Sequence, residues 1–178
     1  MTESSGPGPQ SSSAEPWNRE YPTSLVGFAG ARGIRLPRVP PASNGDMAEL
    51  DGVFYKEIVE QALREFPNEA CGLIAGEGDV PVRVYPMTNA NASSDTYRFD
   101  GQEQFTVFDE VEERGWDIWA IYHSHTHSEA YPSETDIKLA FYPDSRYLLL
   151  SVADREQPVL RSFFIREGEV EEEEMTVT

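Results

Sequence analysis

The sequence predicts an α+β fold, with helices flanking a mixed β-sheet in one folded domain, residues 47–178. Apolar residues recur at spacings of three and four in two segments, which is typical of amphipathic helices. Short apolar runs bounded by glycine or proline predict strands between and after these helices. Helices and strands intermix, and some neighbouring strands are close enough for hairpins, which favours a mixed sheet over a purely parallel one.

The first 46 residues differ in composition from the rest of the chain. They are rich in Ser, Pro and Gly, as in SSGPGPQSSS, and their few apolar residues follow no regular period. Such a segment buries too little apolar surface to offset the entropy of ordering it. We therefore expect residues 1–46 to be a disordered leader. Met47 stands where the folded pattern begins, so we hypothesise that it is an alternative start.

The folded pattern opens with a helix that Asp51 caps at its N-terminus and Pro67 limits at its end. A buried strand over 70–76 and a second strand over 81–86 follow. Beyond them we expect, in order, a loop over 87–95, a short strand at Tyr97 and Phe99, a helix over 101–114, a strand over 116–122, a short helix over 133–141, strands over 146–152 and 159–165, and an edge strand or acidic tail over 169–178.

Charge and composition exclude several classes of function. The formal net charge is −18, and residues 47–178 carry all of it, with 28 acidic and ten basic side chains. Such a surface repels phosphate backbones, so we expect no nucleic-acid partner; it favours a basic partner or serves solubility alone. No apolar run approaches the roughly 20 residues of a membrane span. The single cysteine, Cys71, excludes an internal disulfide and fits a reducing, cytoplasmic setting.

All three histidines fall within five residues, directly after an apolar strand. Side chains two apart on a strand point the same way, so His123 and His125 aim two imidazoles at one point. A third ligand would complete a catalytic zinc site that keeps water in the fourth position. Asp136 can supply this ligand if the loop 126–132 folds back. A carboxylate base must then take the proton from the water, and Glu69 is a candidate if its strand pairs with the histidine strand.

Each of these residues also has an ordinary structural interpretation. A His-x-His pair is common on protein surfaces, and Glu69 alone reads as a solvated loop carboxylate. Ser133, with Asp136 three residues later, is a capping-box-like helix start, which does not exclude a catalytic role. We expect His127 to be a loop residue, Cys71 a small buried side chain without a nucleophilic role, and both Trp116 and Trp119 packing residues.

Taken together, these residues resemble the signature of the JAMM (MPN+) metallopeptidases. That pattern is an upstream Glu, then His-Ser/Thr-His, seven residues, Ser, two residues and Asp. Every element is present, at Glu69, His123, His125, Ser133 and Asp136. The resemblance covers roughly residues 50–165 and is strongest to the small bacterial, Mec-type branch. It implies an α/β/α-like sandwich around a curved, mixed sheet.

The resemblance also implies roles for the residues. His123, His125 and Asp136 would ligate Zn²⁺, Glu69 would activate water and pass its proton to the leaving amine, and Ser133 would stabilise the oxyanion. The implied partner is a small ubiquitin-like sulfur carrier protein, cut at a peptide or isopeptide bond after its C-terminus to release cysteine in cysteine biosynthesis. The alternatives are a non-catalytic MPN-type scaffold and a deubiquitinase-like isopeptidase. The oligomeric state stays open.

Overall fold

The computed structural model describes residues 47–178, which form three helices and eight strands. The predicted disordered leader, residues 1–46, lies outside the described residues. None of the helices in the described part is long and apolar enough to cross a membrane. The helices and strands are β1 Ala48–Leu50, α2 Gly52–Glu65, β2 Cys71–Glu77, β3 Val80–Met87, α3 Gly101–Glu113, β4 Asp117–His125, α4 Glu134–Lys138, β5 Arg146–Ser151, β6 Val159–Arg166, β7 Glu169–Glu173 and β8 Met175–Val177.

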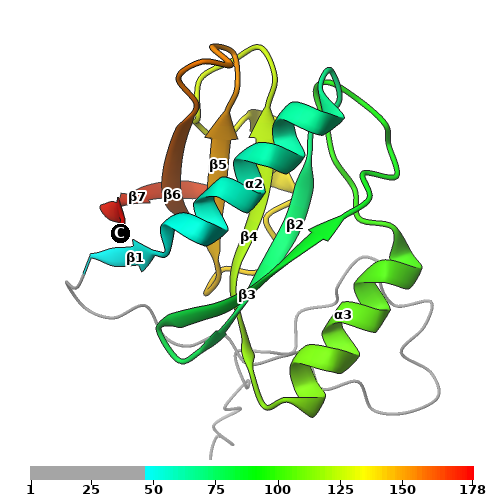
Figure 1. Cartoon of the computed structure of the whole chain (residues 1–178), viewed down its shortest axis with the longest axis vertical. Coiled ribbons are helices and arrows are strands. Elements are labelled where there is room, and N and C mark those ends of the chain that lie inside the picture. Colours follow the sequence, from blue (N-terminus) through cyan, green and yellow to red (C-terminus); the bar gives the residue numbers. More distant parts are fainter. Residues whose placement is uncertain (1–46) are drawn as a thin grey trace, which may run out of the picture. The chain divides into compact units, whose positions relative to one another are not determined.

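Six of the strands form one mixed sheet in the order β3-β2-β4-β5-β6-β7. Only β4 and β5 run parallel within it; every other neighbouring pair is antiparallel. The short β1 and β8 pair in parallel as a separate two-stranded sheet. The edge strand β3 lies obliquely to β5 in Figure 1, as the twist of a curved sheet requires. The α+β class with a mixed sheet is therefore confirmed.

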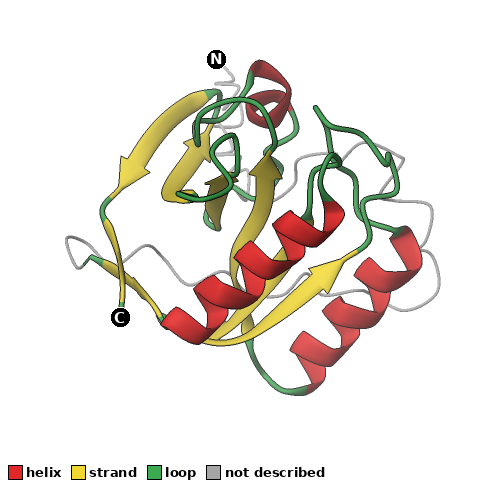
Figure 2. Ribbon diagram, turned by 45° about the horizontal axis from the view of Figure 1, so that its top comes forward, coloured by secondary structure: helices red, strands yellow, loops and turns green. Residues whose placement is uncertain are grey.

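Helices cover both faces of this sheet. Helix α2 crosses one face in front of β2, β4 and β5, and its Ile58 and Ala62 pack there against Ala120 and Tyr122 of β4. The opposite face carries Ile121 of β4 and packs against α3 and α4, as a second core of buried residues. Figure 2 shows α2 and α3 as separate rods against the strands. The histidines of β4 belong to this second face because side chains alternate along a strand.

Local signals in the sequence account for the two longer helices. The Asp51 carboxylate accepts a hydrogen bond from the Val53 amide at 2.7 Å, and α2 ends at Glu65, before the Phe66–Pro67 peptide. The Asp100 side chain caps α3 by accepting from two first-turn amides. A short polar side chain at this position satisfies amides that have no partner within the helix. Both predicted helices are confirmed.

Three predictions about the elements need correction, and one pairing was not foreseen. Strand β4 continues through His125, because its parallel ladder with β5 extends to the pairing of His125 with Ser151. The short strand expected at Tyr97 and Phe99 is absent: Phe99 makes only an isolated bridge to Asn89. Helix α4 is shorter than expected and ends at Lys138. The pairing of β1 with β8 was not predicted: the three residues of β1 are too few to indicate a strand, and β8 lies in the segment 169–178, for which an edge strand or an acidic tail was expected.

The parallel pairing of β4 with β5 shapes the second face. Two parallel neighbours cannot be joined by a tight turn, so the chain needs a crossover. Residues 126–145 form this crossover and contain α4. Ile137 of α4 and the buried Ala130 both pack against the second-face core, so the crossover passes over the face that carries His123 and His125.

A close contact on the first face supports the histidine strand from behind. Gly72 of β2 pairs with Tyr122 of β4, and the Tyr122 hydroxyl donates to the Gln61 side chain at 2.6 Å. The tyrosine ring therefore occupies the space beside Gly72 where a larger residue would carry its Cβ. Only glycine allows this approach without displacing the ring.

We predict that Gly72→Ala lowers the free energy of unfolding by about 1–3 kcal/mol. The added Cβ would collide with the Tyr122 hydroxyl and the Tyr85 carbonyl oxygen. Gly101→Ala is the matched control, because a Cβ there meets nothing within 4 Å. Chemical denaturation of both variants measures the difference, and equal stability of the two would contradict this account of Gly72.

Candidate active site

Two imidazoles meet on the second face of the sheet. His123 and His125 are two residues apart on β4, and their side chains therefore leave the strand on the same side. Both are buried, with 1% and 5% of their surface exposed. Their Nε2 atoms lie 3.2 Å apart. At this separation the two nitrogens need a shared proton or a cation between them.

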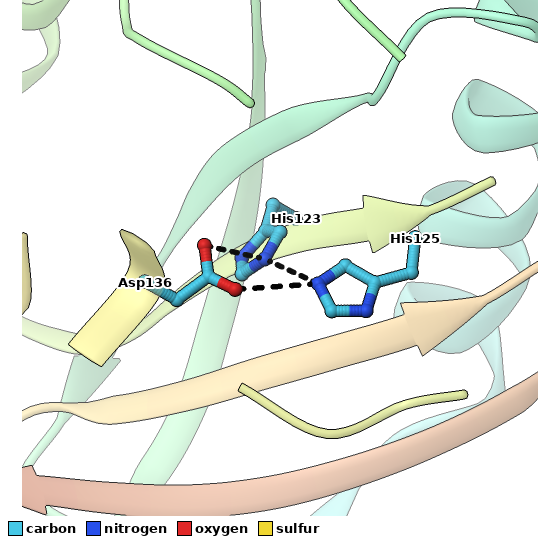
Figure 3. Close-up of side chains that lie close together, drawn as sticks. All are labelled: His123, His125 and Asp136. Carbon is cyan, nitrogen blue, oxygen red and sulfur yellow. Dashed lines mark hydrogen bonds and ion pairs between the residues drawn. The ribbon is translucent and has the colours of Figure 1, made fainter. Parts of the chain in front are cut away.

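Asp136 brings a carboxylate to the same point from α4 (Figure 3). Its Oδ1 lies 3.3 Å from His123 Nε2, and its Oδ2 lies 3.4 Å from His125 Nε2. A capping box holds the aspartate there: the Ser133 amide donates to Asp136 Oδ2 at 2.7 Å, and the Ser133 hydroxyl accepts from the Asp136 amide at 3.2 Å. The crossover therefore brings Asp136 to the two histidines, as the sequence predicted.

The spacing of these ligand atoms suits a tetrahedral metal ion. Ligands about 2.0–2.1 Å from a tetrahedral zinc ion lie about 3.3–3.4 Å from one another. The two Nε2 atoms are 3.2 Å apart, and each has one Asp136 oxygen at 3.3–3.4 Å, Oδ1 for His123 and Oδ2 for His125. Two imidazole nitrogens and one carboxylate oxygen also match the donor types of catalytic zinc sites, which leave one position open. His123, His125 and Asp136 thus form a cluster that could hold a metal ion.

The second nitrogen of His125 is held by the crossover. Its Nδ1 donates to the Glu129 carbonyl at 2.8 Å, and the Ser128 hydroxyl lies 3.0 Å from the same nitrogen. A carbonyl can only accept, so the proton sits on Nδ1 and leaves Nε2 free as a ligand. The crossover itself is fastened to β5, since the Ser151 hydroxyl donates to the Ser128 carbonyl at 2.6 Å. This chain of contacts fixes the direction of the His125 ring.

Burial and proximity set the charges of the cluster. Burial lowers the pKa of His123. Burial also acts to lower the pKa of His125, but hydrogen bonds with Asp136 and the Glu129 carbonyl outweigh it and raise that pKa overall. Burial acts to raise the pKa of Asp136, yet its polar interactions with the two imidazoles hold it well below its ordinary value. The carboxylate is therefore charged and ready to bind a cation.

Glu69 lies beside this cluster because β2 pairs antiparallel with β4. Cys71 is paired with His123, and the Ala70 amide donates to the Ser124 hydroxyl at 2.9 Å, so the register places Glu69 opposite His125. Only 4% of Glu69 is exposed, and its Oε2 has no hydrogen-bond partner among residues 47–178. Burial raises its pKa to about 8, against the lowering effect of a charged His125. The alternative interpretation of Glu69 as a solvated loop carboxylate is therefore wrong.

The three remaining candidates from the sequence differ in exposure and in their distance from the cluster. Ser133 is exposed at the start of α4, where its hydroxyl oxygen accepts a hydrogen bond and its own hydrogen stays available to a second partner. His127 lies in an exposed position outside the cluster, with its ring edge-on to Phe66 at 5.9 Å. Cys71 is fully buried, and burial raises the pKa of its thiol far above the usual range, so it stays uncharged.

Two residues beside the cluster were not singled out by the sequence. Tyr97 stacks on the His123 ring, with the ring centroids 4.5 Å apart. Asn89 is buried and donates to the Glu69 carbonyl at 2.9 Å. Asn89 lies in the predicted loop 87–95, and Tyr97 was predicted only as part of a short strand, so neither pattern pointed to the site. Only the folding of residues 88–100 against β2 and β4 brings them to the site.

Comparison with known proteins places this site in a family. The model of the prokaryotic homologs of the JAB domain matches residues 53–166. The CysO-cysteine peptidase of Mycobacterium tuberculosis (strain ATCC 25618 / H37Rv) is 48% identical over 122 residues, which cover 67% of this chain and 84% of the relative. A probable TtuB-protein conjugate cleaving protease from Thermus thermophilus is 34% identical over 120 residues, covering 67% of this chain and 78% of the relative.

A solved structure agrees with these matches. The solution structure of protein DSY2949 from Desulfitobacterium hafniense superimposes with a TM-score of 0.66 at 36% identity, over 73% of this chain and 92% of that one. The segment matched by the family model, residues 53–166, contains five strands of the main sheet, β2 to β6, together with Glu69, His123, His125, Ser133 and Asp136. The chain therefore belongs to the prokaryotic branch of the JAB (JAMM) domain family.

Proposed function

We propose that this protein is a zinc-dependent metallopeptidase that cuts after the C-terminus of a small ubiquitin-like sulfur carrier protein and releases cysteine. The observation that carries the proposal is the triangle of His123, His125 and Asp136 ligand atoms with the buried Glu69 opposite His125. The M. tuberculosis relative, named for its action on CysO-cysteine, supports the choice of substrate. A place in cysteine biosynthesis and a cytoplasmic location stay predictions.

In this proposal His123 Nε2, His125 Nε2 and the Asp136 carboxylate hold the zinc ion. Bound there, zinc would polarise the scissile carbonyl, lower the pKa of a water molecule and favour the charged form of the neighbouring Glu69. The Glu69 carboxylate accepts the proton of the attacking water on its unpartnered Oε2. It then passes this proton to the nitrogen of the leaving amine as the carbon–nitrogen bond breaks.

Ser133 acts at the same step through its hydroxyl hydrogen. The hydroxyl oxygen caps α4, so the side chain is already held in one direction before substrate binds. A donor that is oriented in advance stabilises the negative charge on the carbonyl oxygen without further reorganisation. The capping role and the catalytic role therefore use different atoms of one hydroxyl group.

A second candidate is an isopeptidase that separates a ubiquitin-like protein from a modified protein. The Thermus relative, named as a conjugate cleaving protease, favours this reading. Both reactions break an amide bond after the same kind of C-terminal tail, so they share the site and differ only in the leaving amine. A non-catalytic scaffold of the same fold is the remaining alternative, and metal analysis separates it from both.

We expect His125→Ala to lose zinc, because only two of the three protein ligands would remain. His127→Ala is the matched control, a histidine two residues away that lies outside the cluster. Metal content after dialysis against zinc measures the effect. Retention of stoichiometric zinc by His125→Ala, or its loss from His127→Ala, would refute the assigned ligands.

Glu69→Gln should keep the metal and abolish turnover, because the amide keeps the size of the side chain but cannot accept a proton. Intact mass of a ubiquitin-like sulfur carrier bearing a C-terminal cysteine, incubated with zinc-loaded protein, reports the reaction. We expect the carrier to lose one cysteine with the unaltered protein and none with Glu69→Gln. Cleavage by Glu69→Gln at the full rate would remove Glu69 from the mechanism, and a carrier left whole by both would point to a different substrate.

Ser133→Ala should lower kcat about 10²–10³-fold with zinc still bound. The backbone amide of residue 133 still donates to Asp136, so the metal ligand stays in place. Ser133→Thr keeps a hydroxyl that both caps and donates, and we expect it to restore most of the rate. Steady-state kinetics with metal analysis test the pair. If the alanine and threonine variants were equally slow, loss of the hydroxyl donor could not be the cause.

A further inference from the structure

We propose that Tyr97 is a positioning residue that fixes the imidazole of His123 by stacking on it. It does so from the loop 88–100, which the buried amide of Asn89 holds in one conformation. This inference rests on the proposed function, in which His123 binds a metal ion. It adds a part of the molecule outside the Glu-His-Ser-His-Ser-Asp signature to the machinery of the site.

The two histidine ligands are held in different ways. His125 donates from Nδ1 to the Glu129 carbonyl, the arrangement usual for metal-binding histidines. His123 Nδ1 is buried, and no residue between 47 and 178 offers it a hydrogen-bond partner. A ring without that bond can rotate about its side-chain torsions unless packing prevents it. Polar contacts therefore hold the His123 ring only at Nε2, within the cluster itself, and packing on the faces of the ring must set how it is turned.

Tyr97 supplies that packing. Its ring lies over the His123 ring with centroids 4.5 Å apart and planes inclined by 24°. Stacked rings of this kind have a preferred mutual orientation, unlike aliphatic contacts, so rotation of the imidazole would lose the contact. Burial raises the pKa of Tyr97 well above its ordinary value, and the phenol ring stays neutral. Tyr97 in turn packs against the second-face core and the Phe99 ring.

The buried side chain of Asn89 holds Tyr97 from both sides along the chain. Its amide nitrogen donates to the Thr96 carbonyl at 3.1 Å, and its carbonyl oxygen accepts from the Arg98 amide at 3.2 Å. A backbone bond from Ala90 to the Arg98 carbonyl, 2.8 Å long, closes the same loop. Because the backbone on both sides of Tyr97 is held, its side chain leaves the loop from a fixed position beside His123.

The same loop also holds Glu69. Asn89 donates its second amide hydrogen to the Glu69 carbonyl at 2.9 Å, and the Glu69 amide donates to the Ser93 carbonyl at 2.8 Å. On the other side, the Thr126 hydroxyl donates to the Ser94 carbonyl at 3.1 Å. The loop is thus bonded to the residue proposed as the base and to the end of the ligand strand. A displacement of the loop would disturb both.

The test compares Tyr97→Leu with Tyr97→Phe. Leucine fills similar space but has no ring plane, whereas phenylalanine keeps the ring and loses only the hydroxyl. We expect Tyr97→Leu to weaken zinc binding about 10–100-fold, the size of effect seen when the support of a metal ligand is removed. Tyr97→Phe should bind zinc as the unaltered protein does. Competition with a chromophoric chelator measures affinity without substrate.

Phe108→Leu is the matched control for a merely structural effect. Phe108 packs against the same core from α3, with its ring on Tyr142, and makes no ring contact with either histidine of the cluster. The unfolding temperature of Phe108→Leu should fall as that of Tyr97→Leu does. The zinc affinity of Phe108→Leu should stay unchanged. A parallel loss of affinity in Phe108→Leu would mean that general destabilisation, rather than stacking, governs the site.

A second measurement needs no metal. In the metal-free protein, the ring current of Tyr97 should shift the imidazole proton signals of His123 upfield, in the unaltered protein and in Tyr97→Phe but not in Tyr97→Leu. Three histidines are few enough to assign by single substitutions. Unshifted His123 signals in the unaltered protein would overturn the stacked arrangement.

The outcomes separate the two proposals. If the unaltered protein binds zinc and Tyr97→Leu binds it equally tightly, the positioning role fails and the metallopeptidase stands. If Tyr97→Phe is as weak as Tyr97→Leu, the hydroxyl matters and stacking does not. If no variant binds zinc, including the unaltered protein, the metallopeptidase fails and the positioning role fails with it.

Discussion

The parallel pairing of β4 with β5 is the constraint on which the rest of the site depends. It forbids a tight turn between the two strands, so residues 126–145 must cross over one face of the sheet. That crossover carries the Glu129 carbonyl to His125 and the Asp136 carboxylate to both imidazoles. An antiparallel hairpin at this point would leave the two histidines without a third ligand.

The site concentrates ionisable groups in a place from which most water is excluded. Two imidazoles and two carboxylates lie close together there, and the pKa values of the carboxylates are shifted in opposite directions: burial raises that of Glu69 to about 8, whereas the two imidazoles keep that of Asp136 low against the effect of burial. Such divergent shifts in one cluster are typical of catalytic sites rather than of ion pairs that only stabilise a fold.

Support for the cluster comes from three directions. Behind β4, the Tyr122 ring fills the space beside Gly72 and bonds to Gln61 of α2. Above it, the crossover is fastened to β5 through Ser151 and Ser128. Beside it, the loop around Asn89 joins the Glu69 segment to the stacked pair of Tyr97 and His123. Ligands held this firmly need little reorganisation when a metal ion or a substrate arrives.

The sequence by itself determined the α+β class, both long helices and the residues of the cluster, because these depend on local periodicity and on the spacing of His123, His125 and Asp136 along one short segment. The extension of β4 through His125 and the pairing of β1 with β8 depended on partners far along the chain, which no local pattern reveals. The burial of Glu69 opposite His125, and the stacking of Tyr97 on His123, were likewise decided only by tertiary structure. Strand register and loop packing set these contacts between residues that the sequence keeps 26 to 56 positions apart.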